Sequence, residues 1–279
     1  VEMDCNVGVK GEGFEYIFGR GKGLVSIRYN GVQLLDDTVR PNFWRAPTNN
    51  DEGCAEPFTF AFWKTAGLYA RCDNLTAETK GDFVIARANY TLPDGQTLPI
   101  DFAIDGAGRC DITMTWQGAR TELPEFGLLF PLRRELTEVS YLGLGPRETT
   151  ADRTAGGKMG VWNYNVRQDF AQNSPVYPQE CGSRTGVYRA ALTGRDTEVP
   201  GIRFASDDGM TFSALPYTPH ELENARHLYE LPRDDNKTIV RCAAFQRGVG
   251  GDNSWGAKPH ADACFAVEKG TSFRFTIQK

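Results

Sequence analysis

The sequence has no lysine- and arginine-rich run, although 31 of its 279 residues are Lys or Arg and 36 are Asp or Glu. The formal net charge of -5 comes from dispersed residues and not from an acidic tail. Proteins that bind nucleic acid usually cluster their basic residues on one face. We therefore expect no nucleic-acid partner.

Long apolar segments are also missing. No stretch approaches the ~20 apolar residues that a membrane-spanning helix needs, and nothing near Val1 resembles a signal peptide. The first methionine is Met3. We therefore expect no membrane partner, and we expect the chain to be a piece of a longer protein.

The cysteines form no CxxC pair and no Cys/His spacing typical of zinc. An odd number, seven, in a chain of this length predicts reduced and mostly buried thiols. This favours a reducing compartment, the cytoplasm over the periplasm, while one extracytoplasmic bridge with spare thiols stays open. We expect no metal or cofactor bound by this chain itself.

Catalytic motifs are lacking as well: there is no G-x-S-x-G, HExxH, Walker or GxGxxG pattern, and no histidine lies in a triad context. Retaining glycoside hydrolysis needs two carboxyls ~5 Å apart, and no pair stands out. We interpret the paired carboxylates as solvated charges in polar turns: Glu122 with Glu125, Asp207 with Asp208, and Asp234 with Asp235. The sequence indicates a binding surface, or one wall of a site whose catalytic groups lie elsewhere.

What the sequence does contain is many short apolar segments joined by turns, with at most two short helices. The absence of βα alternation excludes a Rossmann sheet and a TIM barrel. We predict one all-β domain over residues 1–279, a large antiparallel sandwich with long loops. The expected strands include Phe14–Phe18, Leu24–Tyr29 (turning at Asn30-Gly31), Val32–Leu35, Phe83–Tyr90, Leu98–Ile104, Cys110–Trp116, Glu125–Leu132, Val139–Leu142, Val187–Leu192, Ile202–Ala205, Thr211–Leu215, Thr238–Phe245 and 273–277.

Two helices are expected. Phe58–Tyr69 predicts a short helix laid over an opening of the sheets. Thr218, Pro219 and Glu221 form a helix start with a capping box, and this helix should end near His227. We expect Thr149–Gly160 to contain no strand.

The loop at 248–256 has the most informative composition. An indole, Trp255, stands beside the short polar residues Asp252 and Asn253. An indole can cover the apolar face of a sugar while short polar groups bond its hydroxyls. The alternative is that Trp255 packs beneath its own loop.

Three further segments carry recognition groups on a long loop or at sharp corners of the chain. Arg40–Gly53 contains Arg45, Asn50 and Asp51 and should lack regular structure over most of its length. Tyr141–Glu148 ends with Arg147 and Glu148, which we interpret as an ion pair or as ligands of buried backbone. Val176–Arg184 is a corner that carries Glu180.

The segments Phe43–Asp51, Tyr141–Glu148 and Gly248–Trp255 resemble, in order and spacing, the C-terminal domain of glycoside hydrolase family 2 β-galactosidases, called the small chain when it is a separate subunit. Asn30-Gly31, Tyr177–Glu180 and the final Gln278-Lys279 extend the resemblance over nearly the whole chain.

This resemblance implies a β-supersandwich of two large antiparallel sheets, similar to galactose mutarotase. It implies a galactoside substrate and catalytic glutamates on a TIM-barrel domain that this chain lacks. Trp255 would line the sugar site, with Asp252 and Asn253 orienting the loop or bonding hydroxyls. Arg45, Asn50 and Asp51 would belong to a loop that opens and closes near the site.

The resemblance also implies a parent enzyme that is a homo-oligomer and that often uses Mg and Na. A second hypothesis is a free-standing carbohydrate-binding or aldose-mutarotase-like module, for which His260 and Glu180 would supply the acid and base. A third is a structural domain that only contacts its neighbours.

Overall fold

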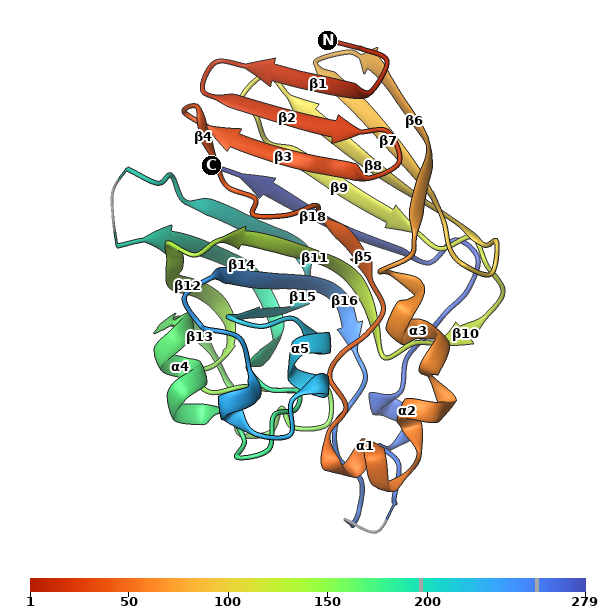
Figure 1. Cartoon of the computed structure of the whole chain (residues 1–279), viewed down its shortest axis with the longest axis vertical. Coiled ribbons are helices and arrows are strands. Elements are labelled where there is room, and N and C mark those ends of the chain that lie inside the picture. The colour runs from red at the N-terminus through yellow and green to blue at the C-terminus, as the bar shows by residue number, and fades with distance from the viewer. Residues whose placement is uncertain (196–197, 254–255) are drawn as a thin grey trace.

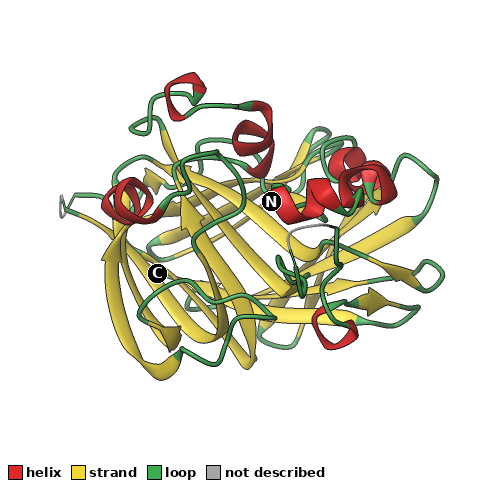
Figure 2. Ribbon diagram, turned by 90° about the horizontal axis from the view of Figure 1, so that it is seen from below, coloured by secondary structure: helices red, strands yellow, loops and turns green. Residues whose placement is uncertain are grey.

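The computed structural model describes residues 1–195, 198–253 and 256–279. It is an all-β structure whose strand pairs, within these residues, are antiparallel, and this confirms the expected fold class (Figures 1 and 2). One layer contains nine strands in the order β13-β12-β14-β15-β18-β9-β8-β7-β6. Their bounds are β6 (Arg71–Lys80), β7 (Phe83–Thr91), β8 (Thr97–Asp105), β9 (Cys110–Thr115), β12 (Leu136–Gly145), β13 (Lys158–Asn165), β14 (Ser183–Gly194), β15 (Ile202–Leu215) and β18 (Ser272–Gln278).

A second layer lies over the first (Figure 1). It combines the four-stranded sheet β1-β2-β3-β4 with β5, β11 and β16, which join the first layer through β15. The bounds are β1 (Asn6–Gly11), β2 (Phe14–Gly19), β3 (Gly23–Tyr29), β4 (Val32–Gln33), β5 (Arg40–Asn42), β11 (Glu125–Arg133) and β16 (Lys237–Gln246). The short strands β10 (Thr121–Glu122) and β17 (Ala266–Val267) pair separately.

The core fills the space between the two layers. The rings of Phe18 on β2 and Phe102 on β8 have centroids 4.9 Å apart, and those of Phe130 on β11 and Phe204 on β15 are 5.4 Å apart. Along β8, burial alternates strictly, as expected for a strand with one face on the core. The glycine at 127 on β11 is required by packing, because a Cβ there would lie 2.2 Å from the carbonyl oxygen of Cys242.

Short helices cover one end of the sandwich, and their bounds are α1 (Asn49–Gly53), α2 (Glu56–Thr59), α3 (Ala61–Ala66), α4 (Val166–Asn173), α5 (Pro219–Asn224), η1 (Leu228–Glu230) and η2 (Ala261–Ala263). Trp63 of α3 packs against Phe43 and Trp116, with ring centroids 5.6 and 5.8 Å away. No helix among the described residues is long and apolar enough to cross a membrane. All seven cysteines are free thiols.

Several local predictions are confirmed. Asn30 and Gly31 both have positive φ, as a tight two-residue hairpin turn requires. The capping box of Thr218 and Glu221 opens α5, although this helix ends at Asn224 and not near His227. The helix expected over 58–69 is present as two pieces, α2 and α3.

Other predictions were wrong. The segment 149–160 contains the start of β13, and the irregular segment 40–53 contains β5 and the capped helix α1. Glu125 is not a solvated turn residue: it lies on β11 and is 1% exposed. The spacing of carboxylates in the sequence does not show whether they are buried, because their burial depends on arginines that are distant in the sequence.

Candidate functional site

The loop after β16 is attached to the segment 45–51 through Arg45, which also forms a buried ion pair with Asp51. The Arg45 guanidinium donates to both carboxylate oxygens of Asp51, at 2.5 and 3.0 Å, and both side chains are nearly fully buried. Arg45 also donates to the carbonyl oxygens of Arg247 and Gly248, at 3.1 and 2.7 Å. Arg45 therefore joins two segments about 200 residues apart.

Asp51 also caps α1. Its carboxylate accepts from the backbone N–H and the hydroxyl of Thr48, at 2.6 and 2.9 Å, and the Thr48 hydroxyl caps the helix in return. Burial acts to raise the pKa of Asp51, but the Arg45 charge and these hydrogen bonds outweigh it and hold the pKa below its ordinary value. Asp51 therefore remains a carboxylate at neutral pH.

A second anchor holds the loop from the opposite side. The Asp152 carboxylate accepts from the backbone N–H groups of Val249 and Gly250, at 3.0 and 2.7 Å, and from the Thr150 hydroxyl at 2.7 Å. Burial acts to raise the pKa of Asp152, yet these hydrogen bonds lower it overall. Asp152 was not among the residues expected at this site, and its only signal in the sequence was a Thr-x-Asp pattern in a polar segment.

A third anchor fixes the start of the loop. The Arg247 guanidinium forms a forked pair with Glu56 of α2, with contacts of 2.7 to 3.1 Å, and a further contact with Glu122 at 3.0 Å. It also lies over the ring of Phe60, 5.1 Å from the centroid. Helix α2 and the loop are thus held as one unit.

Beneath these anchors lies a buried cluster of two carboxylates around one guanidinium. Arg241 on β16 contacts Glu125, at 2.7 Å, and Glu180, and all three side chains are at most 3% exposed. Gln246 donates to both carboxylates at 3.0 Å, and Glu180 also accepts from the backbone N–H of Ala46 at 3.2 Å. This cluster connects the corner at 176–184, which carries Glu180, to the segment that carries Arg45.

The predicted recognition residues are distributed as follows. Asp252 is exposed and its carboxylate lies 2.7 Å from Nε2 of His260, which raises the pKa of that histidine. Asn253 is exposed as well, and Trp255 lies outside the described residues. Gly256, the next described residue after Asn253, has a positive φ. A Cβ at this position would lie 2.8 Å from the carbonyl oxygen of Gly53 at the end of α1. The loop therefore returns against α1.

Of the residues expected on an opening and closing loop, Arg45 and Asp51 form its buried base, and only Asn50 is half-buried. Glu148 accepts from the Gly182 N–H at 2.7 Å and from Arg153 at 2.8 Å, so it binds backbone and a different arginine from the adjacent, exposed Arg147.

The acid and base suggested for a mutarotase-like module are not brought together. Glu180 is buried against Arg241, whereas His260 is exposed and bonded to Asp252. Among the described residues, no group of three or more His, Cys, Asp or Glu converges to hold a metal.

The anchoring of this loop leads to a testable stability prediction. Asp152→Ala would leave the N–H groups of Val249 and Gly250 without an acceptor, so local opening should become easier by roughly 1–3 kcal/mol. Amide hydrogen exchange at these two positions should accelerate accordingly, with strands β8 and β11 unaffected. Thr150→Val is the control with a smaller effect, because it removes the hydroxyl's hydrogen bonds with Asp152 and Arg153 but leaves the Asp152 carboxylate to accept from both N–H groups. Unchanged exchange in Asp152→Ala would show that Asp152 does not hold the loop.

The chain is similar in sequence to several known proteins. A β-galactosidase of Lactobacillus delbrueckii subsp. bulgaricus is 38% identical over 284 residues, covering 100% of this chain and 27% of that protein. A β-galactosidase of Halalkalibacterium halodurans is 33% identical over 288 residues, covering 28% of that protein. A β-galactosidase small subunit of Latilactobacillus sakei is 31% identical over 308 residues, covering 98% of this chain and 95% of that subunit. The chain therefore spans about a quarter of the first two relatives and nearly all of the third.

Among solved structures, a putative aldose 1-epimerase of Escherichia coli K12 is similar with a TM-score of 0.49 at 11% identity, covering 98% of this chain and 97% of the other. The family model described as beta galactosidase small chain matches residues 10–277. This chain belongs to the β-galactosidase small chain family.

Proposed function

We propose that this chain is the non-catalytic C-terminal part of a glycoside hydrolase family 2 β-galactosidase, and that its loop at 248–256 completes the galactoside site. The catalytic glutamates would lie on a TIM-barrel domain or partner chain. The observation that carries the proposal is the triple anchoring of this loop by Arg45, Asp152 and Arg247.

This anchoring supports a recognition role on physical grounds. Three separate charged groups fix the backbone of residues 247–250, while Asp252 and Asn253 at its far end are exposed. A binding group must be held within a fraction of an ångström to contribute fully, and that requires a rigid base under an accessible tip. Trp255 would then present its ring to the apolar face of galactose.

The test uses the enzyme assembled from this chain and its catalytic barrel. Trp255→Ala should lower kcat/KM for a chromogenic β-galactoside by roughly five- to 150-fold, equivalent to about 1–3 kcal/mol of lost transition-state binding. Trp255→Phe should lower kcat/KM less than Trp255→Ala does, because a smaller ring remains. An unchanged kcat/KM for Trp255→Ala would remove this residue from the site.

Two controls accompany this measurement. Phe83→Ala removes a partly exposed aromatic ring on β7, outside the loop, and should leave kcat/KM unchanged. The 279-residue chain alone should not hydrolyse the galactoside. Turnover that survives purification and is lost when a carboxylate of this chain is replaced would refute the division of labour.

A further inference from the structure

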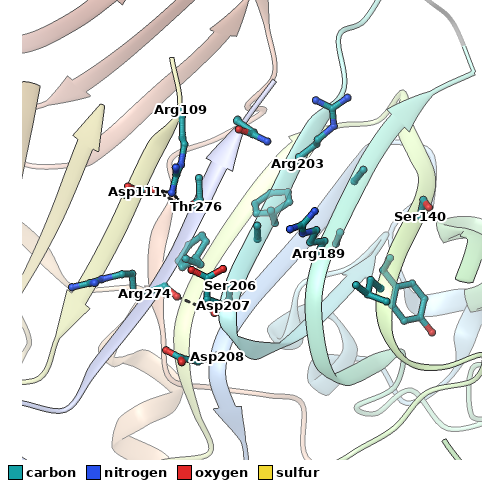
Figure 3. A pocket seen from close by; sticks show the side chains of 18 of the residues that line it. Arg109, Asp111, Ser140, Arg189, Arg203, Ser206, Asp207, Asp208, Arg274 and Thr276 are labelled. Atoms are coloured by element: carbon teal, nitrogen blue, oxygen red, sulfur yellow. Dashed lines mark hydrogen bonds and ion pairs between the residues drawn. The ribbon is translucent and has the colours of Figure 1, made fainter. Parts of the chain in front are cut away.

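A trough of about 920 Å³ lies on the face of the nine-strand layer that points away from the core (Figure 3). Phe204 and Phe275 point inward from β15 and β18, where both rings pack against Phe130. Side chains alternate across a strand, so Arg203, Ala205, Arg274 and Thr276 face the trough. Nothing in the proposed galactoside role uses this face.

Strand register gathers arginines around a floor of short side chains. One row across the sheet runs from Arg189 on β14 through Ala205 on β15 to Thr276 on β18. The next row runs from Ala191 through Arg203. Arg189 and Arg203 are therefore diagonal neighbours on one face, which places them ~7–8 Å apart. The two alanines leave the space between these guanidiniums open.

These guanidiniums lack carboxylate partners. Among the described residues, the side chains of Arg189 and Arg274 have no hydrogen bond or ion pair, and the Arg203 side chain donates to a main-chain oxygen of Lys279, at 2.6 Å. Arg109, at the rim, differs because it pairs with Asp111 at 2.9 Å. Asp207 also lines the trough, two residues from Ala205 on the side opposite Arg203. An anion placed between Arg189 and Arg203, away from Asp207, is therefore stabilised by both guanidiniums.

The other groups of the trough restrict what that anion can be. Asp208 lies at one end of the trough, and Asp207 lies beside Ser206, between Arg274 and Arg189 in the view of Figure 3. Both carboxylates disfavour a ligand that is negative along its whole length, but they can accept hydrogen bonds from hydroxyls. The aromatic rings that line the trough, Tyr141, Phe204 and Phe275, are at most 2% exposed. Stacking on a neutral sugar is therefore absent from this face.

We propose that this trough binds a saccharide that carries a carboxylate, a uronic acid alone or within an oligosaccharide. The carboxylate lies between Arg189 and Arg203, since a guanidinium fork matches carboxylate geometry. Sugar hydroxyls reach Asp207, Asp208 and Thr276. This site is independent of the loop at 248–256 and of the galactoside proposal.

The experiment is calorimetric titration of the 279-residue chain with trigalacturonic acid at low and moderate salt. The trimer should bind, and Arg189→Gln and Arg203→Gln should each weaken its affinity about tenfold or more, because a charge-assisted hydrogen bond is lost. Raising the salt concentration should weaken binding further. Arg87→Gln is the matched control: Arg87 is an exposed arginine on β7 of the same layer that pairs with Asp101 at 2.6 Å outside the trough, and its loss should not change the affinity.

Four results would overturn the proposal. They are no binding of the trimer, equal binding of neutral galactotriose, equal binding of hexaglutamate (which would indicate an acidic peptide), and equal weakening by Arg87→Gln. Chemical shifts of backbone amides on β14 and β15 should move with the trimer, which keeps the site testable if one arginine variant folds poorly.

Discussion

Replacing Arg241 by methionine should lower the free energy of unfolding by about 3–5 kcal/mol, because it leaves two buried carboxylates without their shared cation. Glu125 and Glu180 are each 1% exposed, and both contact Arg241. Denaturant unfolding of the wild-type chain and of Arg241→Met measures the difference. Combining Arg241→Met with Glu125→Gln and Glu180→Gln should recover most of the loss, since no unpaired charge then remains buried.

The pH dependence gives this prediction a sign. Burial is the main cause that raises the pKa of Glu125, while Arg241 acts to lower it. A carboxyl with a raised folded-state pKa stabilises the fold below its unfolded pKa, and this contribution is lost as pH rises through the folded value. Without Arg241 the pKa should rise further, so the deficit of Arg241→Met should shrink on acidification from pH 8 toward about pH 5. A deficit below 1 kcal/mol, equal at both pH values, would contradict the cluster as described.

Most of the strands that could be predicted from the sequence lie in the middle of the layers, although the edge strand β4 was predicted too. Strand β8 alternates cleanly and β11 is almost continuously buried, so each carries a strong pattern. The missed strands include β6 and β13, the two edges of the nine-strand layer, β1, an edge of the four-stranded sheet, and the short strands β5, β10 and β17. Edge strands bury few side chains, as Cys72 and Leu75 show on β6, and their polar sequence then resembles a loop.

The candidate site could also be predicted only in part. Glycine and short polar residues identified the described residues of the loop at 248–256 as an irregular connection, whereas the segment 40–53, predicted in the same way, contains β5 and α1. The anchors of the loop could not be found, because Asp152 meets the loop 97 residues away and Arg247 meets Glu56 over 191 residues. Glu125, which was expected to be solvated, is buried and bonded to Arg241, and only tertiary packing decides whether such a carboxylate is buried.

Replacing Arg45 by methionine should also cost about 3–5 kcal/mol of unfolding free energy, for a related reason. Asp51 would stay buried without its guanidinium, and the carbonyl oxygens of Arg247 and Gly248 would lose their donor. The Asp51 pKa is lowered in the folded chain, so its stabilising contribution is present above the unfolded pKa and is lost as pH falls through the folded value. Asp51→Asn should therefore reduce the change in unfolding free energy with pH in this acidic range. The double variant Arg45→Met/Asp51→Asn should be destabilised by less than the sum of the two single variants.

Arg45→Lys separates charge from geometry at this position. A lysine keeps the positive charge beside Asp51 but cannot fork to both carboxylate oxygens while also reaching Gly248, so an intermediate loss of about 1–2 kcal/mol is expected. Unlike Asp152→Ala, which should open residues 249–250 alone, Arg45→Lys should accelerate amide exchange on both α1 and the loop, because Arg45 bonds to both. If exchange rises on only one of these segments, the two are not held together by Arg45, and the rigid base proposed for the sugar-binding loop loses its main support.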